Sequence, residues 1–481
     1  MSLFLGTDLP VMAATASLGA AFVAYAMRLL IGTALAGARA RRHVIVLGAC
    51  ATVLSVLLGA LLTELGSDRA VLWRNLVRFL PSLAAAAVIG VLVLFPPRRF
   101  ALRAAAVYIA AFSLIIWAWL PSALVRVAFS APPAAFLGQG GLNVVTATNV
   151  RASARLDFGP DERLGSVASG SEGGLKAVTG PFQGVFLPLE RLEGELFLRS
   201  TVDGIEAIGT EDVSSAGTAR SDTARLRFPR AGEPFSFVSF SDIHENVALY
   251  GKLAGNVDFD AMSLAVYLGD FLNHVDSPEQ ARRSIVGLAT GSVALPRAFV
   301  RGNHEARGEG ARSLASWILP ADGEYYYSFT LGDAFFIALD TGEDKPDGSA
   351  AYGGLVDFGA YHRRQAIWLA ERLASREYRD AKARIVLAHI PPTEEPLAEV
   401  EPLWYLLRRR DDIDLVLSGH THEAAIRLPS DTGLPFPVVC SGGGSADTAA
   451  AVAVTVDGGS VSVAIIRPDG SREASSVFGS R

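Results

Sequence analysis

Five short apolar runs, each ending in a loop with Asp, Asn or His side chains, constrain the fold of this chain more than any other feature. The first run covers residues 235–240, is rich in Phe, and stops at Asp242 and His244. Runs of this kind, punctuated by Gly or Pro, are typical of β-strands followed by tight loops. The carboxyl ends of strands in an open α/β sheet usually carry its ligand-binding residues. The four later runs lead to Asp270, Asn303, His304, His389, His420 and His422.

The residue types in these loops indicate a metal site. Five of the chain's eight histidines lie there, whereas histidines that only fill a core would not gather at strand ends. The candidate ligands include no Cys, and mixed oxygen and imidazole donors suit Mn²⁺, Fe or Zn²⁺ rather than a thiolate-rich structural zinc site. Since there are more donors than one tetrahedral ion needs, we predict two divalent metal ions sharing a bridging carboxylate. The predicted ligands are Asp242, His244, Asp270, Asn303, His389, His420 and His422.

A pair of such ions predicts a hydrolytic reaction. Two ions roughly 3.5–4 Å apart hydrolyse phosphate esters by making hydroxide available near neutral pH and by neutralising the phosphate oxygens. We therefore predict a metal-dependent phosphoric ester hydrolase, a phosphatase or phosphodiesterase, in which a metal-bridging hydroxide attacks the phosphorus. His304 lies beside a ligand without being needed as one, so it can act as acid to the leaving oxygen or stabilise the transition state.

Charge is distributed unevenly along the chain. Residues 1–130 contain eleven arginines and three acidic residues, a net charge of +8, which leaves −14 for residues 131–481 out of the overall −6. The acidic part lacks the basic face that nucleic-acid binding needs, so we expect no nucleic acid as a partner.

The first quarter of the chain predicts four transmembrane helices. Four uncharged apolar runs, at residues 9–27, 44–63, 79–97 and 104–125, are each long enough, at about 1.5 Å per residue, to cross a hydrocarbon core of roughly 30 Å. Because the runs contain no ionisable relay, a helical anchor is favoured over a transporter. Arginines in the first and third links place those links in the cytoplasm. We therefore expect an integral protein of a bacterial inner membrane, with its catalytic domain on the outer, periplasmic side.

We predict a multidomain chain in which this four-helix bundle is followed by three further parts. Residues 128–232 contain a Pro/Gly-rich linker and then strand-like runs separated by Gly, Ser and Asp turns, which indicate a small all-β sandwich. Residues 233–470 alternate strand–loop units with helical stretches, as an α/β catalytic domain does. The predicted division is 1–127, 128–232, 233–470 and a C-terminal tail at 471–481.

Taken in order, the loop motifs resemble the five-motif signature of the calcineurin-like metallophosphoesterases. The matching segments are Asp242-x-His244, Gly269-Asp270, Gly302-Asn303-His304-Glu305, His389 and Gly419-His420-x-His422. The resemblance implies a four-layer αββα sandwich over roughly residues 233–470, with Asp270 as the bridging ligand and His304 as the catalytic histidine. It also implies two ligand sets, which are Asp242, His244 and His422 for one ion and Asn303, His389 and His420 for the other.

A narrower resemblance, to purple acid phosphatases, includes the β-rich segment and residues 324–340. It implies that the predicted sandwich is fibronectin-III-like. The chain departs from that family at two positions, because Asn273 stands where the family has a metal-ligating Tyr and His244 stands where the family has no His. We therefore expect a mixed or Mn-type metal pair with His244 as a ligand, rather than a tyrosinate-bound ferric ion.

The sequence leaves the substrate open. A monoester, diester, pyrophosphate, nucleotide or lipid-linked phosphate fits the metal core, because the surrounding loops select the rest of the substrate. Candidates for contacts with the substrate phosphate are His274, four residues after Asp270, and two arginines near Asn303, Arg301 and Arg307. Two other functions remain as alternatives: a catalytically silent binding or scaffold protein that keeps the fold, and a transmembrane sensor or transporter with a regulatory phosphoesterase domain.

Overall fold

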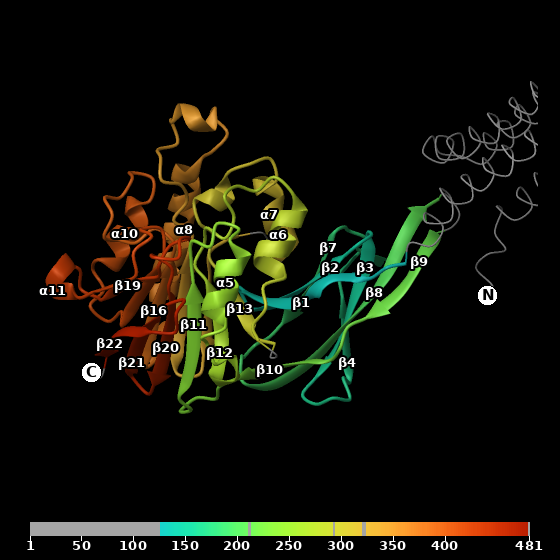
Figure 1. Cartoon of the computed structure of the whole chain (residues 1–481), viewed down its shortest axis with the longest axis horizontal. Helices are drawn as coiled ribbons and strands as arrows, with labels where there is room; N and C mark the ends of the chain where they lie inside the picture. The colour runs from blue at the N-terminus through green and yellow to red at the C-terminus, as the bar shows by residue number, and fades with distance from the viewer. Residues whose placement is uncertain (1–125, 210–212, 292–293, 320–323, 480–481) are drawn as a thin grey trace, which may run out of the picture. The chain divides into compact units, whose positions relative to one another are not determined.

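The computed structural model describes residues 126–209, 213–291, 294–319 and 324–479. Residues 126–207 and 214–481 form one compact unit, which contains two large sheets and the helices that cover them (Figure 1). The four predicted transmembrane runs lie outside the described residues. Within the described ranges, no helix is both long enough and apolar enough to cross a membrane.

The first sheet has nine strands in the order β22-β21-β20-β11-β12-β13-β1-β2-β7. At its centre, β11 (Phe235–Phe240), β12 (Met262–Tyr267) and β13 (Pro296–Phe299) run parallel to one another. These strands are buried along most of their length, which explains their nearly continuous apolar sequences. The flanking strands are β20 (Ala451–Asp457), β21 (Ser460–Ile466), β22 (Arg472–Gly479), β1 (Phe129–Gly138), β2 (Gly141–Thr148) and β7 (Phe182–Pro188).

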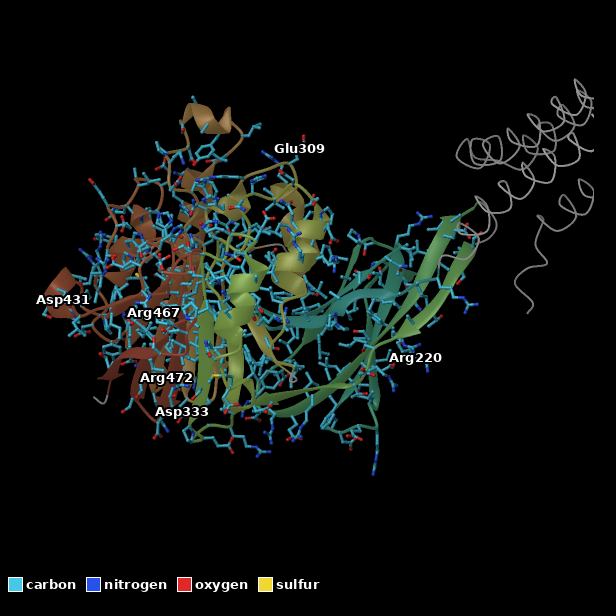
Figure 2. The ribbon with its side chains drawn as sticks, viewed as in Figure 1. Arg220, Glu309, Asp333, Asp431, Arg467 and Arg472 are labelled. Carbon is cyan, nitrogen blue, oxygen red and sulfur yellow. The ribbon has the colours of Figure 1, made fainter. Side chains whose placement is uncertain are left out.

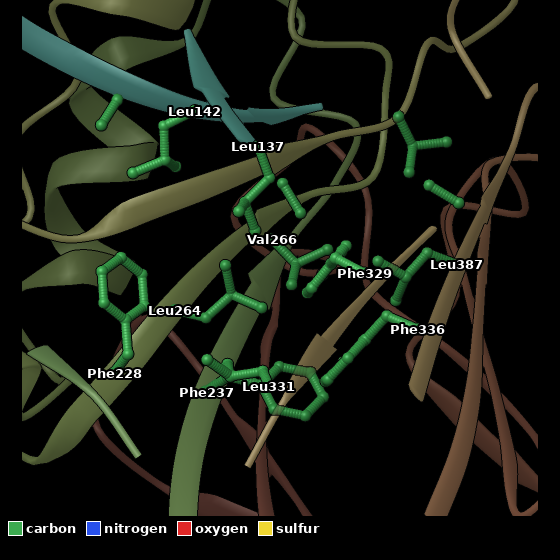
Figure 3. Packing of buried hydrophobic residues seen from close by; sticks show 14 of the residues in the cluster. Leu137, Leu142, Phe228, Phe237, Leu264, Val266, Phe329, Leu331, Phe336 and Leu387 are labelled. Atoms are coloured by element: carbon green, nitrogen blue, oxygen red, sulfur yellow. The ribbon is translucent and has the colours of Figure 1, made fainter. Parts of the chain in front are cut away.

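The second sheet has six strands and packs face to face against the first. Its order is β14-β15-β16-β17-β19-β18. Phe237 of β11 meets Phe336 of β15 edge-on with ring centroids 5.4 Å apart, and Phe336 stacks on Phe329 of β14 at 4.7 Å (Figure 3). The strands are β14 (Tyr327–Leu331), β15 (Ala334–Leu339), β16 (Ala383–Ala388), β17 (Leu415–Ser418), β18 (Ala425–Arg427) and β19 (Val438–Cys440).

Helices cover the outer face of each sheet. Leu314 of α7 and Tyr250 of α5 pack with the outer side chains of the first sheet, and Leu369 of α8 and Trp404 of α10 pack with those of the second. The layers are therefore helix, sheet, sheet and helix, and the α/β prediction for the catalytic region is confirmed. The helices are α5 (Val247–Ala254), α6 (Pro278–Ala281), α7 (Ala311–Ile318), α8 (Phe358–Leu373), α9 (Arg376–Asp380), α10 (Glu401–Leu407) and α11 (Pro429–Thr432), with short turns η1 (Phe259–Ala261), η2 (Arg282–Val286), η3 (His304–Ala306) and η4 (Ala350–Tyr352).

The structure divides residues 128–232 differently from the prediction. Strands β1, β2 and β7 extend the first sheet, because β1 pairs in parallel with β13 through Ala135 and Pro296. The predicted linker, residues 131–133 and 138–141, lies within β1 and the turn from β1 into β2. The region is thus not an independent sandwich, since only part of it forms a separate five-stranded sheet. That sheet contains β3 (Ala152–Gly159), β4 (Ser166–Ser169), β8 (Gly194–Ile208), β9 (Val213–Arg220) and β10 (Ala224–Phe228). Strands β5 (Ser171–Glu172) and β6 (Leu175–Lys176) pair only with each other, as a short hairpin.

The C-terminal residues also differ from the prediction of a tail. Strand β22 occupies residues 472–479 and pairs antiparallel with β21 at the edge of the first sheet. Near the turn that joins the two strands, the Arg467 guanidinium contacts the Glu473 carboxylate at 2.9 Å. Arg467 and Arg472 are labelled in Figure 2. Residues 472–479 therefore form the edge strand of the first sheet.

Candidate metal centre

The seven predicted metal ligands and His304 lie in loops that leave the carboxyl ends of five parallel strands. Strands β11, β12 and β13 of the first sheet and β16 and β17 of the second lead into these loops. Because the sheets pack face to face, loops from both meet at one edge of the sandwich. Three groups of side chains there have ligand atoms within 4.8 Å of one another, namely Asp242, His244 and His422; His244, Asp270 and His304; and Asp270, His389 and His420.

The first cluster is formed around Asp242. Its Oδ1 lies 3.2 Å from Nε2 of His422 and 4.0 Å from Nε2 of His244, and those two Nε2 atoms are 3.1 Å apart. Oδ1 is buried and has no hydrogen-bond partner among the described residues. A buried carboxylate oxygen without a partner is costly in a folded protein. The three converging lone-pair atoms therefore fit a divalent cation.

The second cluster is formed around Asp270 and Asn303. Oδ2 of Asp270 lies 3.3 Å from Nε2 of His389. Oδ1 of Asn303 lies 3.0 Å from the same nitrogen and 3.1 Å from Nδ1 of His420. On its other side, His389 donates from Nδ1 to the Leu268 carbonyl at 2.6 Å, which directs Nε2 into the cluster. The donor set, one carboxylate, one amide oxygen and two imidazoles, again suits a divalent cation.

The backbone of these loops is held in an unusual conformation. Seven non-glycine residues in the described part of the chain have positive φ, and six of them lie in the metal loops. This region is unfavourable for residues with a side chain and persists where surrounding contacts impose it. Two such contacts are the hydrogen bonds from His244 N to the Asp270 carbonyl at 2.9 Å and from Asp242 N to the Gly269 carbonyl at 3.0 Å. The six residues are Asp242, His244, Glu245, Asp270, His420 and His422.

Two glycines of the sequence motifs allow the backbone to lie close to a ligand carboxylate. A Cβ on Gly302 would overlap Oδ1 of Asp270, and a Cβ on Gly419 would lie 2.6 Å from Oδ2 of Asp242. A side chain at either position would thus push a ligand aside. The glycines in the Gly-Asn-His and Gly-His motifs are explained by this contact.

Glu305 supports the second cluster, and sequence reasoning assigned it no role. Its buried carboxylate accepts hydrogen bonds from the backbone nitrogens of Asp270 at 2.8 Å, Leu272 at 2.9 Å and Gly302 at 2.9 Å. Burial, together with the nearby Asp270 charge, raises the pKa of Glu305 to about 7. The signal available in the sequence was its place directly after Asn303-His304.

Asp270 and His389 perturb each other's protonation. Burial by itself would raise the pKa of Asp270, but the adjacent His389 lowers it overall. Burial by itself would lower the pKa of His389, but Asp270 raises it to about 10. The directions of these two pKa shifts favour a carboxylate at Asp270 and an imidazolium at His389, and a divalent cation held by these residues would take the place of the His389 proton.

The structure separates the three candidate substrate contacts. Arg301 donates from Nη2 to Oδ2 of Asp340 at 2.5 Å and lies over the Tyr325 ring at 4.2 Å, so its charge is neutralised inside the fold. His274 is half exposed and pairs with Asp276 at 2.7 Å, outside the three ligand groups. Only Arg307 contacts a residue of these groups, with Nη1 3.4 Å from Nε2 of His304.

Comparison with known families agrees with this geometry. A family model described as calcineurin-like phosphoesterase matches residues 235–424. This part of the chain is a calcineurin-like phosphoesterase domain. The domain contains all seven predicted metal ligands and His304.

Solved structures resemble the chain over a longer stretch than the phosphoesterase domain. Purple acid phosphatase PPD1 from yellow lupin (Lupinus luteus) seeds matches 74% of this chain and 74% of its own, at 15% identity and a TM-score of 0.52. PhoD matches 73% of this chain and 90% of its own at 14% identity and a TM-score of 0.47, and a dimetal phosphatase from Danio rerio matches 51% and 99% at 15% identity and 0.40. At 15% identity, the likeness to the purple acid phosphatase shows the fold alone. None of the curated proteins compared with the chain matches it.

Proposed function

We propose that the protein is a dinuclear, metal-dependent phosphoric ester hydrolase. The observation that carries this proposal is the convergence of oxygen and nitrogen donors from five strand ends into adjoining groups, with Asp270 common to two of them. We assign Asp270 to the position between two cations, of Mn, Fe or Zn type. The remaining ligands would be Asp242, His244 and His422 for one cation and Asn303, His389 and His420 for the other.

The proposed reaction divides the work between cations and side chains. Two bound divalent cations supply positive charge to the phosphoryl oxygens and lower the pKa of water at the site. Asp242 is held in place by hydrogen bonds to its Oδ2 from Ser241 Oγ at 2.5 Å and His420 N at 2.9 Å. His304 donates from Nδ1 to the Asn273 carbonyl at 2.6 Å, which leaves its Nε2 directed at the reaction centre, 3.9 Å from Asp270 Oδ2. From Nε2, His304 delivers a proton to the leaving oxygen.

An activity screen tests this proposal. The detergent-solubilised full chain, loaded with Mn²⁺, Fe²⁺ or Zn²⁺, should hydrolyse p-nitrophenyl phosphate or its bis-ester, and metal analysis should find two ions per chain. Asp270→Asn and His304→Ala should lower kcat by at least about 100-fold. Asp431→Asn, at an exposed position on α11, serves as the matched control and should leave kcat unchanged. Full activity of the Asp270→Asn enzyme would refute the assignment.

We also propose that residues 1–127 anchor the enzyme in a bacterial inner membrane, with the catalytic domain on the periplasmic side. The four uncharged runs and the arginines of the links between them support this location. A membrane-proximal site would give access to lipid-linked phosphate esters as well as to small ones. Protease added to intact spheroplasts should degrade the catalytic domain, and protection of that domain from the protease would contradict the orientation.

A further inference from the structure

Two carboxylates in the loop after β15 bind an arginine that also contacts the metal centre. Arg307, three residues after His304, donates from Nε to Oε1 of Glu343 at 2.9 Å and from Nη2 to Oε2 of Glu343 at 2.7 Å. Nη2 also donates to Oδ1 of Asp344 at 2.7 Å. The Glu343 side chain is only 1% exposed. A buried carboxylate that binds a guanidinium through two nitrogens holds its plane in one orientation.

That orientation turns the remaining nitrogen of Arg307 toward the proposed reaction centre. Nη1 lies 3.4 Å from Nε2 of His304, the atom assigned to protonate the leaving oxygen. A guanidinium has five N–H groups. The carboxylates of Glu343 and Asp344 accept three of them, and Nε2 of His304 can accept one while it carries no proton, so at least one N–H on Nη1 has no partner among the residues that the structure describes. The side chain is 27% exposed, so a ligand entering from solvent can reach it.

The charges around Arg307 do not repel an anion on balance. Asp344 also accepts a hydrogen bond from Nζ of Lys345 at 2.6 Å. The two cations, Arg307 and Lys345, therefore balance the two carboxylates of Glu343 and Asp344. The guanidinium of Arg307 is the positive group next to His304, and Glu343 binds the guanidinium through Nε and Nη2, away from the Nη1 atom that contacts His304.

We propose that Arg307 binds the substrate by donating from Nη1 to an oxygen of its phosphate group, and that Glu343 is the positioning residue for that contact. Arginine suits this task because its guanidinium stays charged and its N–H groups match phosphate oxygens. The inference rests on the proposed phosphoesterase function and adds to it the residue that recognises the anion. It applies to monoesters and diesters alike, because both present a non-bridging phosphate oxygen.

The test compares variants of the Mn²⁺-loaded full chain. Arg307→Gln should lower kcat/KM for p-nitrophenyl phosphate by about 100-fold, since the lost donor faces the charge that develops on the phosphate. It should also weaken inhibition by inorganic phosphate by about tenfold and leave the metal content unchanged. Arg307→Lys should recover part of the activity because it keeps the charge, and Glu343→Gln should cost less than Arg307→Gln because the guanidinium is retained. Arg312→Gln, at an exposed position on α7, is the matched control and should behave as the unaltered protein.

Two results would overturn the inference. One is an Arg307→Gln protein that binds inorganic phosphate as tightly as the unaltered chain. The other is loss of metal from that variant, which would mean that Arg307 supports the structure of the metal centre instead of binding the substrate. Phosphate binding is measured by calorimetry and needs no turnover. If the unaltered chain hydrolyses no ester but binds phosphate in an Arg307-dependent way, the proposed function fails, whereas the assignment of Arg307 as a phosphate-binding residue stands. If it binds no phosphate at all, the inference fails as well.

Discussion

Replacement of Gly302 by Ala should disable the metal centre without changing a single ligand. A Cβ at this position would lie 2.9 Å from Cγ of Asp270, where an ordinary van der Waals contact is 3.4–4 Å, and it would overlap the Oδ1 and N atoms of the same residue. The carboxyl group must therefore move by at least about 0.5 Å, and by more at Oδ1. Sites of this kind tolerate displacements of only about 0.5 Å, and a shift of about 1 Å can cost about 100-fold in rate.

We therefore expect Gly302→Ala to lower kcat by about 100-fold and to reduce the metal content from two ions to one or none. The φ of Gly302 is not in the left-handed region, so alanine can adopt its backbone conformation and the effect is one of contact alone. Gly348→Ala is the matched control, because a Cβ at Gly348 meets nothing within 4 Å. The assays are steady-state hydrolysis of p-nitrophenyl phosphate and metal analysis after gel filtration. A Gly302→Ala enzyme with two ions and kcat within threefold of the unaltered chain would refute the reasoning.

Three further predictions address the support of the centre and the core. Glu305→Gln replaces one of the two accepting carboxylate oxygens by an amide NH2 group, which cannot accept a hydrogen bond from the backbone N–H groups around it. We therefore expect the free energy of unfolding, measured by chemical denaturation, to fall by about 1–3 kcal/mol and metal binding to weaken. Unchanged values of both would contradict the role of the carboxylate. Because the pKa of His389 is raised to about 10, Mn²⁺ that binds at pH 8 must displace the His389 proton. Calorimetry in buffers of different ionisation enthalpy should detect this proton release. The affinity for Mn²⁺ should rise as the pH approaches 10. Binding without proton release would disprove that protonation state. Phe336→Ala should cost about 3–5 kcal/mol of unfolding free energy because the ring is fully buried between the sheets against Phe237, and a loss below about 1 kcal/mol would contradict this packing.

The local sequence was enough to locate the donor loops of the metal centre. Strands buried on both faces, such as β12 and β16, need continuous apolar residues, so each strand and the loop after it can be recognised without knowledge of the rest of the chain. The ligand types and their glycines lie in those loops. The proximity of Asp242 and Asp270, which follow the parallel neighbours β11 and β12, is expected because parallel strands expose their carboxyl ends at one edge of a sheet. The convergence of Asp242 with His422 also requires the two sheets to pack face to face.

The partners of strands and charges were decided only by the tertiary structure. The pattern of apolar and polar side chains in residues 129–148 does not indicate that β1 pairs with β13. The pairing depends on which strand has an unpaired edge beside β1 once the sheet has formed. The two arginines near Asn303 look equivalent in sequence. Folding brings Asp340 and aromatic rings to Arg301, whereas it brings Glu343 to Arg307, which lies three residues after His304 and contacts it. The separation of these two roles depends on the loop after β15, which is distant in sequence and meets both arginines only when the two sheets pack together.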